Sequence, residues 1–518
     1  MQLSESIESK LEFLLSKPIL SLSIVMVLGL SLRVYFTPWH LPTESFDAFI
    51  FMIEGTEYSR GDFSPLSHRF LWPMFLSAFF LIFRFDSYFE YMTLVRIISI
   101  IISTLSIPVL YLISKQFVGV KYAILATVFF AVEANLVENS IFGITEPMFI
   151  LLGLSSFYFI IQKNEKYFPL AFVFAGLAFD TRINGIVLIL ILIVLSIVKI
   201  KNQKTSFKTL LIGILLFFVI IAPINLIYPV LEGNRVLPYI GDTITTISKG
   251  QEYYSTGELG GNSSSLDVIQ NSIKNVIMNF FRITIPYLII LFPFGMFISL
   301  KNINYEKKIL FSVIVFSLII AIFQHTISNE YRNLFFIIPF LCVFSAITFE
   351  KLTEKIELKN IFLILLILGI ILISANFLRE RYDIDERYII EKDNLGKYIA
   401  NNLEGNITGD MRLEIIRNMV DLKIGSYFFN ERISFFDPGI PIDSVSKLMD
   451  YCIQNKIDYL VVEQNKIEKH FPIFNNIEFN EDDLSFLEKI YDTEKSDYQK
   501  LRVNIFKINY DKYQDSLN

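Results

Sequence analysis

The feature that most constrains this chain is a series of apolar stretches of about 17–25 residues, each long enough to cross a bilayer as a helix. Hydrophobic residues make up 53% of the 518 positions, and the mean hydropathy is +0.49. Soluble domains average roughly 45–50% apolar residues and distribute them more evenly. The chain is therefore predicted to be a mainly α, polytopic membrane protein.

We expect about eleven membrane-spanning helices from the lengths of these stretches. The shorter apolar stretch Phe70–Phe83 follows an acidic segment without a charged loop between them, and we predict an interfacial or re-entrant helix there. The predicted spans are residues 18–37, 92–114, 121–135, 146–162, 168–180, 184–199, 208–228, 278–300, 309–326, 332–348 and 360–377.

The placement of lysine between the spans orients the chain, because cytoplasmic loops carry the excess of Lys and Arg. The first outer loop, residues 38–91, contains no lysine, and the long outer loop, residues 229–277, contains Lys249 and Lys274. The loops on the other side are all lysine-bearing. We predict a multi-pass protein of the plasma membrane with a cytoplasmic N-terminus and an extracytoplasmic C-terminus.

The composition changes near residue 378, where charged residues return and the apolar runs become short. The segment 457–463 (IDYLVVE) is typical of a buried strand, and 444–455 (SVSKLMDYCIQN) of an amphipathic helix before it. The segment 502–509 (RVNIFKIN) alternates like a second strand. We therefore predict a transmembrane catalytic domain at residues 1–377 and a small extracytoplasmic α/β domain at residues 378–518.

The first outer loop contains the strongest candidate for chemistry. A helix that starts near Thr43 separates carboxylates from apolar side chains, with Glu44, Asp47 and Glu54 on one face and Phe46, Phe49, Ile50 and Ile53 on the other. Such a helix would lie along the membrane surface with its carboxylates turned away from the lipid. Asp47 is the expected centre of the chemistry.

Charged residues near the membrane gather on the predicted outer side. Ionisable groups at the ends of spans are costly unless they pair or line a wet cavity, so they are functional candidates. Arginine suits phosphate because its planar group donates two hydrogen bonds in parallel. The set is Glu44, Asp47, His68, Arg69, Glu133, Glu138, Glu146, Asp180, Arg182, Arg282, Glu330 and Arg332. Arg33, inside the first span, has no place in this pattern.

Each candidate also has a structural explanation. Glu44 could cap the start of its helix, and Asp47 could be a solvated acid on a surface helix. Glu146 precedes Pro147, an arrangement that favours a helix start through the dipole and the fixed proline backbone. Asp180 and Arg182 could pair with each other across a tight turn. The common side of these residues is more informative than any one of them.

Five segments together resemble the C-type glycosyltransferase superfamily, in its protein O-mannosyltransferase and lipid-A aminoarabinose-transferase branch. The resemblance covers roughly residues 18–350. The segments are TESFD with its acidic pair Glu44 and Asp47, the WP pair at 72–73, NSIFGITEPMFILL at 139–152, DTRINGIVL at 180–188 and NEYRNLFFIIPFL at 329–341.

This resemblance implies an enzyme that transfers a sugar from a polyprenyl- or dolichyl-phosphate carrier to a protein, lipid or glycan acceptor, with inversion. Asp47 would be the general base and Glu44 would assist or orient it, although which of the two is the base stays open. The residues expected to bind the lipid phosphate or the substrate are Arg69, Arg182, Arg282, Arg332, Glu146 and Asp180. No cofactor is certain, but Asp47, Glu44 and His68 could hold a divalent metal such as Mg²⁺ or Mn²⁺.

Two other functions remain open at this stage. A transporter or flippase of lipid-linked sugars should show inverted repeats and charges near the bilayer midplane, whereas most charges here lie at one interface. A non-catalytic partner subunit would tolerate replacement of Asp47. The expected partners are the lipid carrier, the acceptor and the bilayer, and nothing in the chain indicates nucleic acid. The absence of a WWDYG segment argues against an oligosaccharyltransferase.

Overall fold

The computed structural model describes the greater part of the chain. The described residues are 8, 12–13, 17–42, 45–63, 70–201, 205–227, 265–301, 305–326, 329–381, 385–409, 445–463 and 484–516. They form two compact units. The helical unit comprises Met1–Thr37, Asp62–Phe79 and Thr93–Asp383, and the mixed unit comprises Pro38–Gly61, Phe80–Met92 and Ile384–Asn518. The predicted division after residue 377 remains a prediction. The mixed unit also takes in two parts of the predicted first outer loop.

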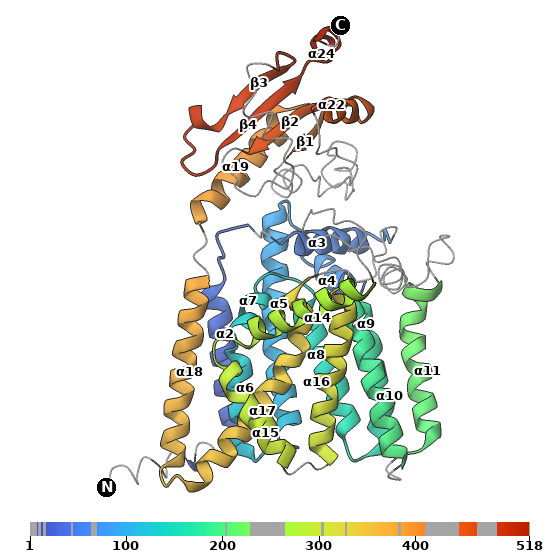
Figure 1. The fold of residues 1–518 in the computed structure, drawn as a ribbon, viewed down its shortest axis with the longest axis vertical. Helices are drawn as coiled ribbons and strands as arrows, with labels where there is room; N and C mark the ends of the chain where they lie inside the picture. The colour runs from blue at the N-terminus through green and yellow to red at the C-terminus, as the bar shows by residue number, and fades with distance from the viewer. Residues whose placement is uncertain are drawn as a thin grey trace. The chain divides into compact units, whose positions relative to one another are not determined.

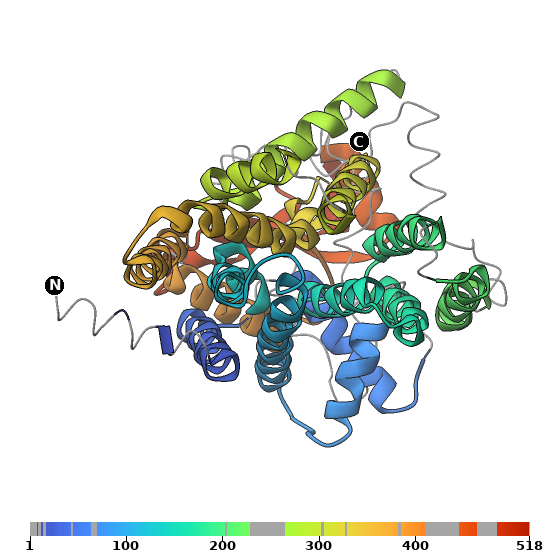
Figure 2. The ribbon, with the colours of Figure 1, turned by 90° about the horizontal axis from the view of Figure 1, so that it is seen from below.

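Most helices of the helical unit run side by side, whereas α14 lies across them (Figures 1 and 2). By length and composition, seven described helices could cross a membrane, or nine if two bent pairs each count as one span. The predicted fold class is confirmed, whereas the count of about eleven spans is not. The helices are α2 (Pro18–Phe36), α4 (Leu71–Phe80), α5 (Tyr88–Ser114), α6 (Val120–Ala131), α7 (Ala134–Ser140), α8 (Glu146–Ile161), α9 (Phe168–Thr181), α10 (Ile186–Lys201), α11 (Phe207–Ala222), α14 (Ser265–Thr284), α15 (Leu288–Lys301), α16 (Tyr305–Gln324), α17 (Ile338–Leu352) and α18 (Lys359–Arg381), with α4 and α5 extending a few residues into the mixed unit.

The apolar stretch 278–300 was predicted as a regular span, and Phe70–Phe83 as an interfacial or re-entrant helix. The stretch 278–300 is not one straight helix, because α14 and α15 meet at an angle of 104°. Pro286 lies in the break, where it has no N–H for a helical hydrogen bond. The stretch Phe70–Phe83 forms the ten-residue helix α4. Ten residues span about 15 Å, half the thickness of a bilayer core.

Helix α17 lies at the centre of the packing and is buried along nearly its whole length. It approaches α15 so closely that a Cβ added to Gly295 would clash with the Phe344 carbonyl oxygen. Thr348 of α17 donates a hydrogen bond to the Leu291 carbonyl across the same contact, at 2.9 Å. The glycine therefore sets the separation of these two helices.

Arg33, which the sequence pattern left unplaced, is fully buried in α2. Its guanidinium donates to the carbonyl oxygens of Gly29 and Ala131, both at 2.9 Å, and to the Ser103 hydroxyl at 3.0 Å. Ala131 is the last residue of α6, where the chain bends by 55° into α7. Because the last carbonyls of a helix lack partners within it, Arg33 serves as a cap for α6 at this bend.

The mixed unit contains a four-stranded sheet in the order β1-β2-β4-β3. Strand β1 (Asn406–Gly409) runs parallel to β2 (Ile457–Glu463), while β4 (Val503–Ile508) runs antiparallel to β2 and to β3 (Leu487–Asp492). Helix α22 (Val445–Gln454) packs Leu448, Met449 and Cys452 against this sheet. The predicted helix at 444–455 and both predicted strands are therefore confirmed.

Helix α19 (Glu386–Asn402) connects the other parts of the mixed unit. Glu391 accepts hydrogen bonds from three consecutive backbone N–H groups, at 499–501, with distances of 2.8–2.9 Å. Burial raises the pKa of the Glu391 carboxyl, but these N–H groups together with Arg387 outweigh it and hold that pKa below its usual range. Asp393 accepts from the Tyr88 hydroxyl at 2.9 Å, and Glu386 pairs with His40 at 3.3 Å. These contacts attach residues 38–61 and 80–92 to α19. The last helix, α24 (Tyr510–Ser516), follows β4.

Candidate functional site

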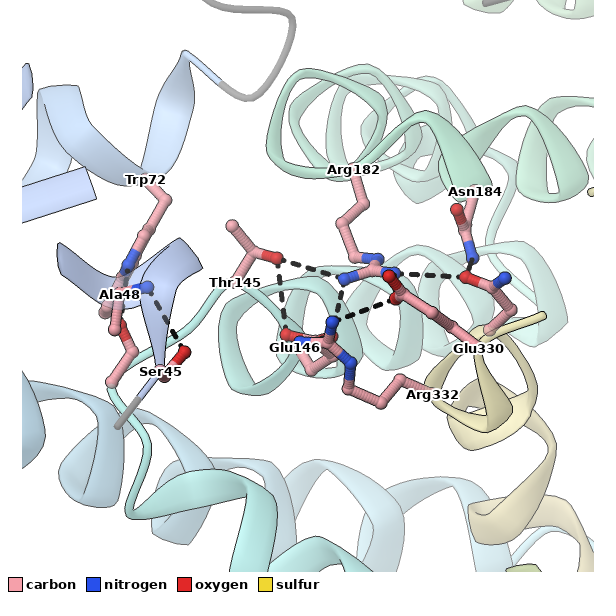
Figure 3. Close-up of polar contacts among 11 residues, drawn as sticks. Ser45, Ala48, Trp72, Thr145, Glu146, Arg182, Asn184, Glu330 and Arg332 are labelled. Atoms are coloured by element: carbon pink, nitrogen blue, oxygen red, sulfur yellow. Dashed lines mark hydrogen bonds and ion pairs between the residues drawn. The ribbon is translucent and has the colours of Figure 1, made fainter. Parts of the chain in front are cut away.

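Seven polar residues of the helical unit come together in one group, which we call the arginine cluster (Figure 3). They come from the start of α8, from the 3-10 turn η2 (Ile183–Gly185) after α9, and from the 3-10 helix η4 (Tyr331–Ile337) before α17. Segments far apart in the sequence thus meet at one place. The members are Thr145, Glu146, Arg182, Asn184, Glu330, Arg332 and Asn333.

Local backbone geometry presents these side chains. Glu146 is the first residue of α8 and Pro147 follows it, as the helix-start explanation predicted. Arg182 ends α9 with an extended backbone, φ −151° and ψ 136°, which directs its side chain away from the helix. Glu330 is the N-cap residue of η4, so Glu330 and Arg332 flank the first residue of that helix.

The buried side of the arginine cluster is organised by Glu146, whose side chain is 1% exposed. Its Oε1 lies 2.5 Å from Arg182 Nη1 and 3.4 Å from Arg332 Nη1. The Thr145 hydroxyl is 3.4 Å from the same Arg182 nitrogen. One buried carboxylate therefore fixes both guanidinium groups in place.

The exposed side of the arginine cluster is organised by Glu330, whose side chain is 39% exposed. Its Oε2 lies 2.9 Å from Arg332 Nη2 and 4.0 Å from Arg182 Nη2. Arg182 Nη2 also donates to the Asn333 amide oxygen at 3.1 Å, which accepts from Asn184 as well. Each arginine thus directs Nη1 toward the buried carboxylate and Nη2 toward the exposed one.

Two arginines and two glutamates make the arginine cluster formally neutral. Arg182 is 6% and Arg332 20% exposed, so Arg182 is buried and Arg332 is the more accessible of the two. Guanidinium groups bind carboxylate and phosphate oxygens with the same planar, bidentate geometry. A phosphate that reaches the exposed side would meet donors already held in position.

Trp72, from the WP pair, supports the segment that leads into the arginine cluster. Its side chain is fully buried and its indole nitrogen donates to the Gly143 carbonyl at 3.2 Å. Gly143 has φ +79°, a conformation that residues with a Cβ rarely adopt. The tryptophan thus anchors the turn two residues before Thr145.

Two predicted site residues of the helical unit have other partners. The Asp180 carboxylate is buried and accepts a hydrogen bond from Asn225 at 2.7 Å, whereas Arg182 pairs with Glu146. The alternative explanation, in which Asp180 and Arg182 pair with each other, therefore does not describe these contacts. Residues two apart at a helix end point in different directions. The Arg282 guanidinium lies over the Tyr331 ring, 4.0 Å from its centroid. It therefore contacts the residue next to Arg332.

Asp47 belongs to the mixed unit and lies in the first turn of helix α3 (Phe46–Ser59). The helix is capped by the Ser45 hydroxyl, which accepts from the Ala48 backbone N–H at 3.3 Å (Figure 3). Asp47 is partly exposed. Glu54 is buried at 3% exposure, which differs from a helix with one solvated acidic face.

The remaining predicted site residues, Glu44, His68 and Arg69, lie outside the described residues. The proposed metal-binding combination of Asp47, Glu44 and His68 therefore remains a prediction. Among the residues that the structure describes, no group of three or more His, Cys, Asp or Glu side chains is arranged to hold a metal ion.

Sequence reasoning placed Glu330 among the outer charges but did not assign it to the site, and it missed Thr145, Asn184 and Asn333. The Glu-x-Arg-Asn order at 330–333 was the signal for Glu330 and Asn333, since residues three apart at the start of a 3-10 helix lie on the same side. The positions of Thr145 and Asn184, next to Glu146 and two residues after Arg182, were weaker signals.

Comparison with known proteins gives one family match. Residues 67–228 match the family model described as dolichyl-phosphate-mannose-protein mannosyltransferase. This segment includes Trp72, Glu146 and Arg182. No curated protein sequence matches the chain.

Solved structures with the same fold extend over most of the chain. ArnT from Cupriavidus metallidurans bound to undecaprenyl phosphate has a TM-score of 0.55 at 12% identity, with 94% of this chain and 97% of ArnT covered. The Archaeoglobus fulgidus oligosaccharyltransferase in complex with Zn and sulfate has a TM-score of 0.56 at 14% identity, with 85% and 68% covered. The oligosaccharyltransferase AglB from Archaeoglobus fulgidus in complex with an inhibitory peptide and a dolichol-phosphate has a TM-score of 0.53 at 11% identity, with 85% and 69% covered.

Proposed function

We propose that this chain is a C-type membrane glycosyltransferase that transfers a sugar from a polyprenyl- or dolichyl-phosphate carrier to an acceptor on the outer face. The fold that it shares with ArnT and the family-model match over residues 67–228 support this proposal. The observation that carries the proposal is the convergence of Arg182 and Arg332 on Glu146. Two guanidinium groups held by a buried carboxylate form a rigid site for an anion.

The lipid carrier is the substrate that fits this site. ArnT and AglB have been solved with undecaprenyl phosphate and with a dolichol-phosphate, and the matching family is described by its use of dolichyl-phosphate-mannose. In this chain Arg182 and Arg332 would bind the phosphate and stabilise the charge that develops on it as the sugar leaves.

Asp47 would act as the general base. The carboxylate would take the proton of an acceptor hydroxyl while that oxygen attacks the anomeric carbon, and the bond from this carbon to the phosphate oxygen would break. Attack opposite the departing phosphate inverts the anomeric centre. Glu44 would orient Asp47 or the acceptor. The place of Asp47 in the predicted first outer loop, at the start of α3, supports its role as the base.

The experiment that tests the proposal measures two quantities in purified full-length protein. The first is transfer of radiolabelled sugar from a polyprenyl-phosphate donor to native membranes, and the second is binding of radiolabelled polyprenyl phosphate. Asp47→Asn should lower transfer by about 10²–10⁴-fold and leave binding intact. Asp511→Asn is the matched control, since Asp511 is an exposed acid in the first turn of α24.

Arg332→Gln should weaken polyprenyl phosphate binding and transfer together, while Arg379→Gln, at an exposed arginine of α18, should change neither. If Glu44→Gln abolishes transfer and Asp47→Asn does not, the base is Glu44. If both carboxylate variants keep transfer and cellular function, the partner-subunit function replaces the catalytic one.

A further inference from the structure

We propose that Glu330 is an internal competitor of the lipid phosphate: the phosphate displaces the Glu330 carboxylate from Arg332 and Arg182, and Glu330 returns to release the product. This inference rests on the proposed function, because it assumes that the arginine cluster binds the carrier. It assigns to Glu330 the control of how tightly donor and product are held.

The geometry separates the two carboxylates of the arginine cluster by role. Glu146 contacts the Nη1 atoms of both arginines, at 2.5 and 3.4 Å, from the buried side. Glu330 faces the Nη2 atoms of the same arginines, at 2.9 and 4.0 Å, from the exposed side. A phosphate oxygen that approaches from outside meets the Nη2 atoms, and so competes with Glu330 rather than with Glu146.

Exposure indicates which carboxylate can leave. The Glu146 side chain is 1% exposed, so moving it would leave buried guanidinium charge without its counter-ion, which is costly. The Glu330 side chain is 39% exposed, and a carboxylate at that depth can be solvated by water after it turns away. Exposed ion pairs contribute little net free energy, so the exchange of Glu330 for another anion is inexpensive.

Charge balance distinguishes donor from product. The donor phosphate is a diester with one negative charge, so its exchange for the Glu330 carboxylate leaves the arginine cluster neutral. Transfer breaks the bond between the anomeric carbon and a phosphate oxygen, forms the bond from that carbon to the acceptor oxygen, and passes the acceptor proton to the base. The carrier phosphate becomes a monoester with a second negative charge, roughly −1.5 to −2 in total at pH 7.

This extra charge creates the need for a competitor. Two preorganised arginines bind the monoester more tightly than the diester, so the product would remain in the site. Glu330 lies within reach of both Nη2 atoms. Its carboxylate can pair with Arg332 again as the product phosphate leaves the arginine cluster. Glu330 is therefore a specificity-determining residue, which weakens the binding of both lipids and restrains product inhibition.

The test compares binding of radiolabelled C55 polyprenyl phosphate, which is the product monoester, in wild type, in three single variants and in one control variant of the full chain. Glu330→Gln keeps the size of the side chain and removes its charge. It should bind the monoester about three- to tenfold more tightly, with a lower KM for the donor and stronger product inhibition. Glu330→Asp, an acid one methylene shorter, should bind with intermediate affinity.

Glu354→Gln is the control for loss of one negative charge, because Glu354 is an exposed acid paired with Lys351 at 2.7 Å. It should bind the monoester like wild type. The third variant, Arg332→Gln, separates the two proposals. If Arg332→Gln loses binding while Glu330→Gln binds as weakly as wild type or more weakly, the phosphate site stands and the competitor role is refuted. If neither variant changes binding, the phosphate site itself is refuted.

Discussion

Glu146 offers the sharpest test of how the arginine cluster is built, because one buried carboxylate serves two arginines. Glu146→Gln keeps the shape of the side chain but removes the carboxylate charge that pairs with Arg182, which is 6% exposed. Removing one partner of a buried ion pair costs about 3–5 kcal/mol. Arg332 is 20% exposed and can turn toward water, so most of this cost comes from Arg182.

The assay is thermal unfolding of the detergent-solubilised full-length protein. The entropy of unfolding is about 2 cal/mol/K per residue, or about 1 kcal/mol/K over 518 residues. We therefore expect Glu146→Gln to lower Tm by about 3–5 °C. The control is Glu354→Gln, which removes an ion pair of 2.7 Å whose side chains are more than half exposed. That change should shift Tm by less than about 1 °C.

A double-mutant cycle decides whether the cost belongs to the pair. Glu146→Gln combined with Arg182→Gln should show a coupling of about 1–3 kcal/mol, because the two substitutions remove the two partners of one ion pair. If Glu146→Gln leaves Tm unchanged, or if the two effects add without coupling, Glu146 does not fix Arg182 and the reasoning behind the arginine cluster is wrong.

Three further outcomes are expected. Glu391→Gln should speed hydrogen exchange of the backbone amides at 499–501, which donate to the Glu391 carboxylate in wild type. In wild type the protection of these amides should be present above the ordinary carboxyl pKa and be lost as pH falls through the lowered pKa of Glu391. Unchanged exchange in the variant would show that Glu391 does not protect these amides. Gly295→Ala should destabilise the protein by several kcal/mol, since the new Cβ would meet the backbone of α17. The control Gly369→Ala has open space around the new Cβ and should be neutral or stabilise by up to about 1 kcal/mol. Equal Tm values for the two variants would contradict this. Arg33→Met should cost about 3 kcal/mol. It should lower Tm more than Arg33→Lys, because the lysine keeps a charged donor for the end of α6.

The sequence by itself determined the elements whose cause is local. Apolar length predicted the helices, since a bilayer requires about 20 apolar residues in a row. A short apolar run predicted β2, alternation predicted β4, and an amphipathic helical pattern predicted α22. The break between α14 and α15 had a local signal in Pro286, but the length of the apolar stretch outweighed it.

The sequence also indicated that the polar groups are gathered on one side, because charges at span ends follow from the same local pattern. It did not determine their partners. Asp180 and Arg182 are neighbours in the chain, yet Asp180 pairs with Asn225 and Arg182 with Glu146.

Only the tertiary structure decided these partners. The extended backbone at Arg182 turns its side chain away from α9, and the packing of α8, α9 and η4 brings together segments separated by 36 and 151 residues. Which carboxylate is buried and which is exposed follows from that packing. A charge pattern along the chain carries no information about depth, and depth is what distinguishes Glu146 from Glu330.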